Sequence, residues 1–104
     1  MMRAVESLTY QEFNNNLNTR FTVQTDPNSS IDVELTELSE LTSHPGQEYF
    51  SIVVRGPNEF FLDQGLRHFA HTVLGEFELF IVPIKQDSLG YYYEAIFNRL
   101  LPSR

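Results

Sequence analysis

The chain has 104 residues, of which 41% are hydrophobic and 13% aromatic, and its formal net charge is -7. This length predicts one domain with a single core over residues 1–104, and the composition is that of a globular protein rather than a disordered one. The lack of cysteine excludes disulfides, thiol nucleophiles and cysteine-ligated metals, and the acidic balance argues against nucleic acid as a partner.

The first predicted element is a short helix over about residues 9–16. Thr9 and Glu12 fit a capping box, in which the hydroxyl and the carboxylate each bind a free backbone N–H of the first turn. Phe13 would then face the core. The run of asparagines at 14–16 favours a turn, so we expect the helix to end there.

Six strands are predicted where apolar and polar residues alternate between clusters of turn formers. They cover about residues 19–25, 31–41, 47–55, 65–72, 76–84 and 91–97. Short loops join them, which argues against βαβ units. The chain is therefore predicted to be mainly β, a single small domain whose antiparallel strands form a barrel or a two-layer roll behind the short N-terminal helix.

The alternation breaks in the second strand, near Thr36 and Glu37. We expect either a β-bulge at this point or a strand that ends in an irregular turn.

The loop after the third strand carries Phe60, Phe61 and Leu62, which are too apolar to be solvated together. We expect them to plug one end of a barrel or to cover a sheet face. The alternative is an exposed tip that binds a partner.

The fifth strand becomes apolar on both faces at Phe80 and Val82, as in a strand that is covered on both sides or that meets another chain. Pro83 has no N–H to donate to a strand ladder, so the strand must be bulged or lie at a sheet edge there. An edge invites pairing with a partner.

Two histidines and two glutamates in this region raise the question of a metal site. His68 and His71 are three residues apart, which on one strand directs their side chains to opposite faces. A shared zinc site is therefore disfavoured, and no metal is predicted. Glu76 and Glu78 share a face opposite the apolar residues of their strand, so we expect both in solvent, with Arg67 as a cross-strand partner.

Four polar residues, Arg55, Gln64, Arg67 and His71, are predicted to lie near one end of the fold. With the high phenylalanine and tyrosine content they support a barrel that binds a small molecule as an alternative function. A metal-dependent hydrolase that uses His71, Glu76 and His68 is less favoured.

Location and partners follow from what the sequence lacks. The closest basic group, Arg55 with Arg67 and Lys85, is too sparse for nucleic-acid binding. No apolar run approaches the ~20 residues of a membrane-spanning helix, and the N-terminus lacks the apolar segment of a signal peptide. We expect a cytoplasmic protein with no membrane contact and no cofactor.

Several motifs resemble a family of small bacterial proteins known only as a domain of unknown function. They are F-x4-R-G-P (residues 50–57), L-x-Q-G (62–65), H-x2-L-G-E-F-E-L-F-I-V-P (71–83) and Y-E-A-x-F-N (93–98). The resemblance covers roughly residues 9–98, with Arg67 standing where a tyrosine is usual. It implies a β domain with no activity, cofactor or site to transfer, and a structural or assembly role near phage-tail-collar-like genes.

The hypothesis that the sequence favours is a non-enzymatic structural or protein-interaction module, active in the assembly of a phage-tail-like or surface apparatus. Its partner would be another protein or a second copy in a homo-oligomer, joined by strand addition at an exposed edge. The candidate contact residues are Phe60, Phe61, Phe80, Val82 and Pro83.

Overall fold

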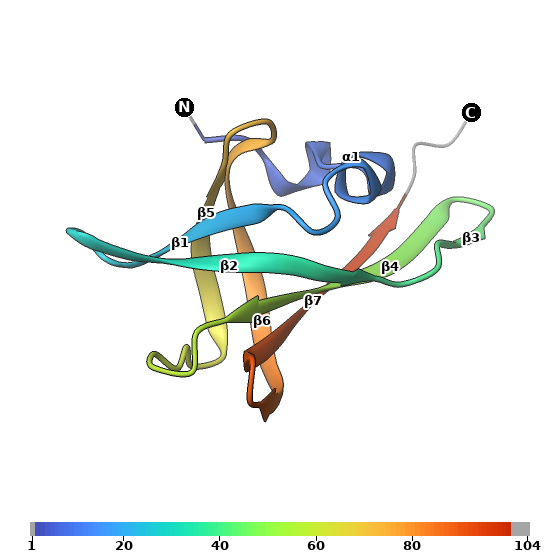
Figure 1. The fold of residues 1–104 in the computed structure, drawn as a ribbon. Coiled ribbons are helices and arrows are strands. Elements are labelled where there is room, and N and C mark those ends of the chain that lie inside the picture. Colours follow the sequence, from blue (N-terminus) through green and yellow to red (C-terminus); the bar gives the residue numbers. More distant parts are fainter. Residues whose placement is uncertain (1, 101–104) are drawn as a thin grey trace.

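The computed structural model describes residues 2–100, so residue 1 and residues 101–104 of the predicted domain lie outside the described part. The described residues are mainly β, which confirms the predicted class (Figure 1). The elements are a 3-10 turn η1 (Val5–Ser7), the helix α1 (Tyr10–Asn15) and the strands β1 (Arg20–Asp26), β2 (Ser29–Leu38), β3 (Thr42–His44), β4 (Gln47–Gly56), β5 (Gly65–His71), β6 (Gly75–Asp87) and β7 (Gly90–Leu100).

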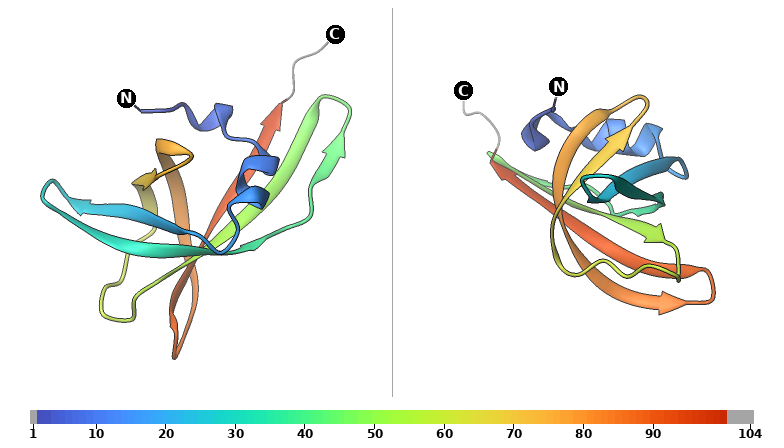
Figure 2. Two further views of the ribbon diagram at one scale, coloured as in Figure 1. Left: turned by 45° about the horizontal axis from the view of Figure 1, so that its top comes forward. Right: turned by 90° about the vertical axis from the view of Figure 1, so that its left-hand side faces the viewer.

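Six strands close into an antiparallel barrel, as predicted. Their order is β2, β1, β5, β6, β7 and β4, and β4 pairs back to β2 to complete the ring. The strand β3 pairs with the first residues of β4 and extends the sheet beyond the ring. Figure 2 shows the barrel with α1 lying across one of its ends.

The strand predicted over residues 31–41 corresponds to β2, which ends earlier, at Leu38, and the short strand β3 was not predicted. The chain leaves the ladder at Ser39, whose side-chain oxygen accepts a hydrogen bond from Ser51 N at 2.8 Å and whose N–H donates to Ser51 O at 2.9 Å. The pairing of β2 with β4 shifts register between Leu35 and Glu37 and then continues to Leu38, so the structure has the bulge, which is the first of the two alternatives expected at this point.

One end of the barrel is closed by α1, which begins with the predicted capping box of Thr9 and Glu12. Phe13 is fully buried beneath the helix. Its ring lies 5.2 Å from the ring of Phe97, which in turn stacks on Phe50 at 4.7 Å. These aromatic contacts fix the helix over the barrel, because rings at such distances gain dispersion and quadrupole energy in addition to burial.

The opposite end is closed by the loop between β4 and β5. Leu62 is buried there, and its N–H donates to the hydroxyl of Tyr93 at 2.9 Å. Phe61 packs its ring edge-on against Tyr91 at 5.0 Å but stays half exposed, as does Phe60. Of the three residues predicted to form a plug, Leu62 fills the barrel end and the two phenylalanines remain accessible.

The seams of the barrel differ greatly in length. The strands β4 and β7 pair along the whole of β4, from Gln47–Leu100 to Gly56–Tyr91. Among the described residues, β1 and β5 pair only at Thr22–Ala70 and Val23–Phe69. The seam between β6 and β7 is also short, and it forms the candidate site described next.

Candidate protein-interaction site

The strands β6 and β7 separate as they run toward the end that α1 covers. Within residues 2–100 their pairing extends only from Asp87–Gly90 to Val82–Glu94. Beyond Val82, β6 continues beside β5 while β7 continues beside β4. Figure 1 shows β6 upright and β7 running diagonally away from it, so a wedge opens between the two strands.

Two strand edges face this wedge. The carbonyl of Glu76 accepts from Arg3 N at 2.6 Å on the side away from β5, which fixes the direction of alternate residues along β6. Because backbone groups point to opposite sides at successive residues, those of Glu78 and Phe80 also point toward β7. The same alternation directs the backbone of Ile96 and Asn98 on β7 toward β6.

A groove of about 800 Å³ lies over the wedge. Its outer surface includes Leu66, Phe80 and Ile96, which are 61%, 53% and 55% exposed. Leu66 and Phe80 are partners in the register of β5 and β6, so their side chains stand next to each other on the outer face. Glu6 and Glu78 border this apolar strip.

The N-terminal segment crosses the upper end of the wedge and joins its two sides. On the β6 side, the guanidinium of Arg3 donates to the Leu74 carbonyl at 3.1 Å and forms an ion pair with Glu12 at 2.7 Å. The hydrogen bond from Arg3 lowers the pKa of the Glu12 carboxyl. On the β7 side, Arg99 donates to the Leu8 carbonyl.

Arg99 also helps to hold the β7 side of the wedge. Its guanidinium forms an ion pair with Glu48 at 2.6 Å and lies over the rings of Phe50 and Phe97, at 5.2 and 5.6 Å from their centroids. A planar cation over aromatic faces is favoured electrostatically. The upper end of the wedge is therefore covered by the chain itself, and the part beside Phe80 is open.

Pro83 lies at the lower end of the wedge. The sequence predicts either a bulge or a sheet edge at this residue, and the structure has both. The pairing of β6 with β7 shifts register between Pro83 and Lys85, which is a bulge. The neighbouring strand β5 begins at Gly65, opposite Ile81, so β6 is an edge from Val82 onward on that side. Proline is tolerated because its missing N–H would face the side that β5 has left.

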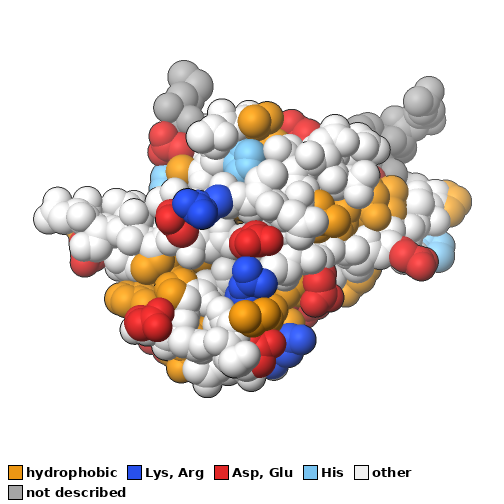
Figure 3. All heavy atoms as spheres, viewed as in Figure 1, with side chains coloured by type: hydrophobic (Ala, Val, Ile, Leu, Met, Phe, Trp, Pro, Cys, Tyr) orange, Lys and Arg blue, Asp and Glu red, His pale blue; other side chains and the backbone are white. Residues whose placement is uncertain are grey.

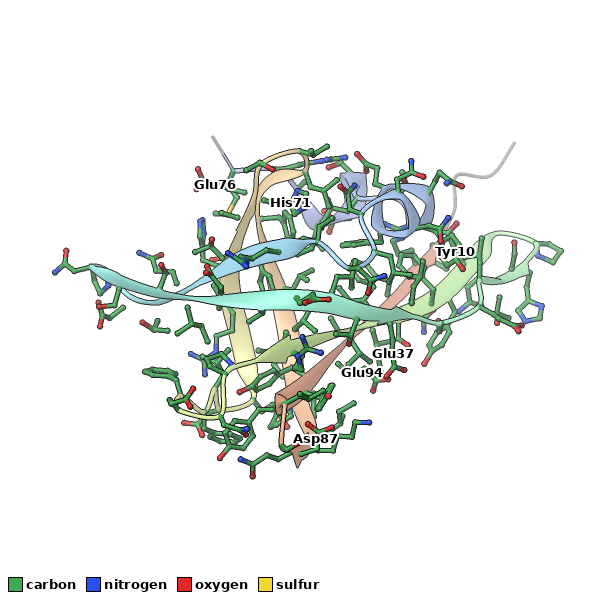
Figure 4. The ribbon with its side chains drawn as sticks, in the orientation of Figure 1. Tyr10, Glu37, His71, Glu76, Asp87 and Glu94 are labelled. Atoms are coloured by element: carbon green, nitrogen blue, oxygen red, sulfur yellow. The ribbon has the colours of Figure 1, made fainter. Side chains whose placement is uncertain are left out.

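The two histidines point to opposite sides of β5, as their spacing predicts. His68 lies on the outer face, where its Nε2 is 3.0 Å from a carboxylate oxygen of Glu76. His71 points inward and packs against Phe21, with ring centroids 4.3 Å apart and ring planes tilted by 46°. Both His71 and Glu76 lie at the barrel end that α1 covers (Figure 4).

The ring nitrogens of His71 are both occupied. Nδ1 accepts from the N–H groups of Val73 and Leu74 at 3.0 and 3.2 Å. Nε2 is 2.9 Å from the hydroxyl of Thr19, which itself donates to Asn16 O, so Nε2 carries the proton and donates. Burial lowers the pKa of His71, which favours this neutral form. The ring ties the start of β1 to the turn after β5.

The predicted polar cluster does not form. Arg55 lies on the outer face of β4 and pairs with Glu34 at 3.1 Å, while Gln64 is exposed in the loop. Arg67 and His71 both point inward, but they are four residues apart on β5 and lie toward opposite ends of the barrel. The cluster is divided in two ways. Arg55 points to the outer face of the barrel while Arg67 and His71 point to the inner face, and the length of β5 separates Arg67 from His71.

Arg67 also differs from its predicted role as a partner of Glu76 and Glu78. Arg67 lies two residues before the buried Phe69, so both side chains are on the inner face of β5. The guanidinium of Arg67 donates to Asp63 O at 2.7 Å. The Nε atom of Arg67 is buried and has no hydrogen-bond partner among the described residues. The two glutamates face outward as predicted, and His68 takes the place of Arg67 beside Glu76.

Metal-ligating side chains stay dispersed over residues 2–100, where no three of the His, Asp or Glu type gather closely enough to hold a metal ion. No helix within the same residues has the length and apolar composition needed to cross a membrane.

The sequence prediction found Phe80 but missed Leu66 and Ile96, which complete the apolar strip. An available signal was the position of Leu66 on β5, because Leu66 must point to the face opposite that of Phe69, which is buried. No comparable signal shows that β7 diverges from β6, because Ile96 has the same pattern in a paired strand and in an unpaired one.

The fold and this site define a small antiparallel β-barrel domain with an apolar groove at an incompletely paired seam. The chain belongs to the family described as a domain of unknown function, DUF6916, whose model matches residues 8–97. This match confirms the resemblance to a family of unknown function. No curated protein and no solved structure matches the chain.

Proposed function

We propose that this domain is a non-enzymatic protein-interaction module whose binding site is the groove between β6 and β7. The observation that carries the proposal is the outward-facing strip of Leu66, Phe80 and Ile96, each more than half exposed, above two strand edges. Exposed apolar surface of this kind is costly in water and is typical of surfaces that bind partners. The strand edges add backbone groups that a partner segment can satisfy.

The chemistry of the titratable side chains supports a non-enzymatic role. Both nitrogens of His71 are engaged in holding the fold, and His68 is paired with Glu76 on the outer face. A general base needs a nitrogen or carboxylate that is free to reach a substrate proton, which His71 does not offer.

The setting that we propose is the assembly of a phage-tail-like or surface apparatus, which is the role that the family resemblance implies. We place it in the cytoplasm because the chain has no cysteine. The partner is a different protein in this proposal. Self-association is the alternative, and it would bring together two chains that each carry a net charge of -7.

Affinity capture from an extract of the native organism tests the proposal, with a matched pair of variants. Phe80→Ser removes an aromatic ring from the groove, and Phe60→Ser removes one of similar exposure, 43% against 53%, at the far end of the barrel. We expect a stoichiometric partner that the wild type and Phe60→Ser retain and that Phe80→Ser loses. Equal retention by all three proteins would contradict the groove as the binding site, and loss from Phe60→Ser alone would assign the interaction to the loop.

Small-molecule binding is the second candidate function, and the size of the groove is the observation that favours it. Its volume of about 800 Å³ is within the range of small-molecule sites. The ligand would bind in the groove, because stacked rings such as Phe50 and Phe97 fill the barrel interior. Native mass spectrometry of protein purified from its own organism tests this candidate, which requires a bound organic molecule that Phe80→Ser does not retain.

A further inference from the structure

The backbone geometry of the wedge specifies the kind of segment that would fit it. Glu78 and Phe80 on β6 direct N–H and C=O groups into the wedge, and Ile96 and Asn98 on β7 do so from the other side. An extended chain presents donors and acceptors at the same two-residue interval, whereas a helix satisfies its own backbone. The wedge therefore matches a strand.

The chain itself shows that this edge of β6 accepts an extended segment. Met2 forms a parallel bridge with Glu76, and Arg3 N donates to Glu76 O at 2.6 Å. The N-terminal segment then leaves this pairing and forms η1, which begins at Val5 and remains close to β6. The next positions along the same edge, Glu78 and Phe80, continue the pairing surface toward the open part of the groove.

The side chains around the wedge indicate the composition of the incoming strand. Phe80 and Ile96 offer apolar surface on the outer face, while Glu6 and Glu78 offer carboxylates beside it. Neither of these two carboxylates forms an ion pair with another described residue. Neighbouring side chains on adjacent strands gain energy when apolar meets apolar and acid meets base.

The opposite face of the molecule provides a contrast in charge. Acidic and basic side chains intermix on the surface seen in Figure 3. The ion pairs on β1, β2 and β4 include Arg20 with Asp32 at 3.8 Å and Arg55 with Glu34 at 3.1 Å. The groove lacks such balance, because Arg99, the one arginine among residues 2–100 that lines it, is already paired with Glu48. A cationic partner would meet unpaired acids there.

We propose that the wedge between β6 and β7 receives an extended segment of a partner protein, whose outward-facing residues, two apart in sequence, include both apolar residues and a lysine or arginine. This inference rests on the proposed function and names its partner class. The segment pairs through its backbone with Glu78 and Phe80, with Ile96 and Asn98, or with both edges. Its apolar side chains cover the strip of Leu66, Phe80 and Ile96, and its cations lie beside Glu6 and Glu78.

Selection of short random peptides displayed on phage, with the whole purified chain as the bait, tests the composition and spacing. We expect enriched peptides that carry apolar residues and a lysine or arginine at positions two residues apart, so that both kinds of side chain lie on one face of an extended chain. Synthetic copies should bind Phe80→Ser at least about tenfold more weakly than the wild type, and Phe60→Ser should bind as the wild type does. Glu78→Gln should weaken the binding of these peptides and reduce its dependence on salt.

The outcomes separate this inference from the proposed function. Enriched peptides that are acidic, or whose apolar residues recur every three to four positions, would overturn the strand inference while leaving the groove as a binding site if Phe80→Ser weakens them. Peptides that bind Phe80→Ser as tightly as they bind the wild type would overturn both the strand inference and the proposed function of the groove. An absence of enriched peptides would overturn this inference alone, because the capture experiment tests the proposed function independently.

Discussion

The two edges of β7 differ greatly in how much of their length is paired with a neighbouring strand. On one edge, every residue from Tyr91 to Leu100 has a registered partner in β4. On the other edge, pairing with β6 stops at Glu94, and the strand continues past Ile96 beside an open groove. One strand thus takes part in both the best-paired seam of the barrel and the site proposed for binding.

The difference shows that a barrel can close without a continuous ladder. Above Glu94, the gap between β6 and β7 is spanned by the N-terminal segment, through Arg3 on one side and Arg99 on the other. Beneath that segment, Phe13 and Leu8 fill the core. The paired edge contributes stability, while the open edge leaves backbone and apolar groups for a partner.

The largest difference in stability is expected between two alanine variants, one at Phe50 on the paired side of β7 and one at Phe80 on the open side. Phe50→Ala should lower the free energy of unfolding by about 3–5 kcal/mol, because it removes a fully buried ring and leaves a cavity. Phe80→Ala should lower it by less than about 1 kcal/mol, since that ring is half exposed in the groove. Urea denaturation measures both values, and similar losses would mean that Phe80 is part of the core.

Two glycines give a second comparison, between the closed lower end of the β6–β7 seam and the start of β5. Gly90 has φ +154°, and an added Cβ would lie 2.0 Å from the carbonyl oxygen of Gly56. Gly90→Ala should therefore cost about 1–3 kcal/mol or more in stability. Gly65 has a similar φ of +156° but open space around it, so Gly65→Ala should cost less. Thermal unfolding would contradict this account if the two variants melted at the same temperature.

The other short seam, between β1 and β5, is expected to depend on pH through His71. Burial lowers its pKa in the folded state, so below the ordinary value of 6.5 the unfolded chain binds more protons than the native one. The stabilisation is thus fully present above pH 6.5 and is lost as the pH falls from there toward the folded pKa. Urea denaturation between pH 7 and 5 should show this loss.

The control for this titration is His71→Gln, which has no group that ionises in that range. Its stability should fall less than that of the wild type between pH 7 and 5. Parallel pH profiles for the two proteins would show that the ring does not hold the seam in its neutral form.

The smallest effect on stability is expected for a matched pair of exposed leucines. Leu66 lies in the groove with 61% exposure, and Leu89 lies in the turn after β6 with 66% exposure. Each serine variant should change the free energy of unfolding by no more than about 0.5 kcal/mol. Partner capture should be lost with Leu66→Ser and retained with Leu89→Ser, and the reverse result would move the binding site to the turn.

Much of the fold follows from local pattern. The capping box at Thr9 and Glu12, the strand alternation and the bulge near Glu37 all depend on neighbours in sequence, which is why they were predicted. The opposite directions of His68 and His71 follow from the same pleating. The inward direction of Arg67 follows from the same pleating, because Arg67 lies two residues before the buried Phe69.

The site was less predictable, because it depends on how strands diverge. Phe80 and Pro83 indicated an exposed edge, and the structure places Pro83 at a bulge and an edge together. The divergence of β6 from β7 lies at the barrel end that α1 covers, where Phe13 of the helix packs against Phe97 of β7. That contact joins residues far apart in the chain, so no local pattern specifies it or the exposure of Ile96.

Amide hydrogen exchange along β7, followed by NMR at low protein concentration, tests the central claim most directly. The N–H groups of Ala95 and Phe97 face β4 and should exchange slowly, whereas those of Ile96 and Asn98 face the wedge and should exchange fast. Addition of a selected peptide should slow Ile96 and Asn98 without changing Ala95 and Phe97. Uniformly slow exchange along β7 in the free protein would contradict the account, because it would mean that the edge is already paired.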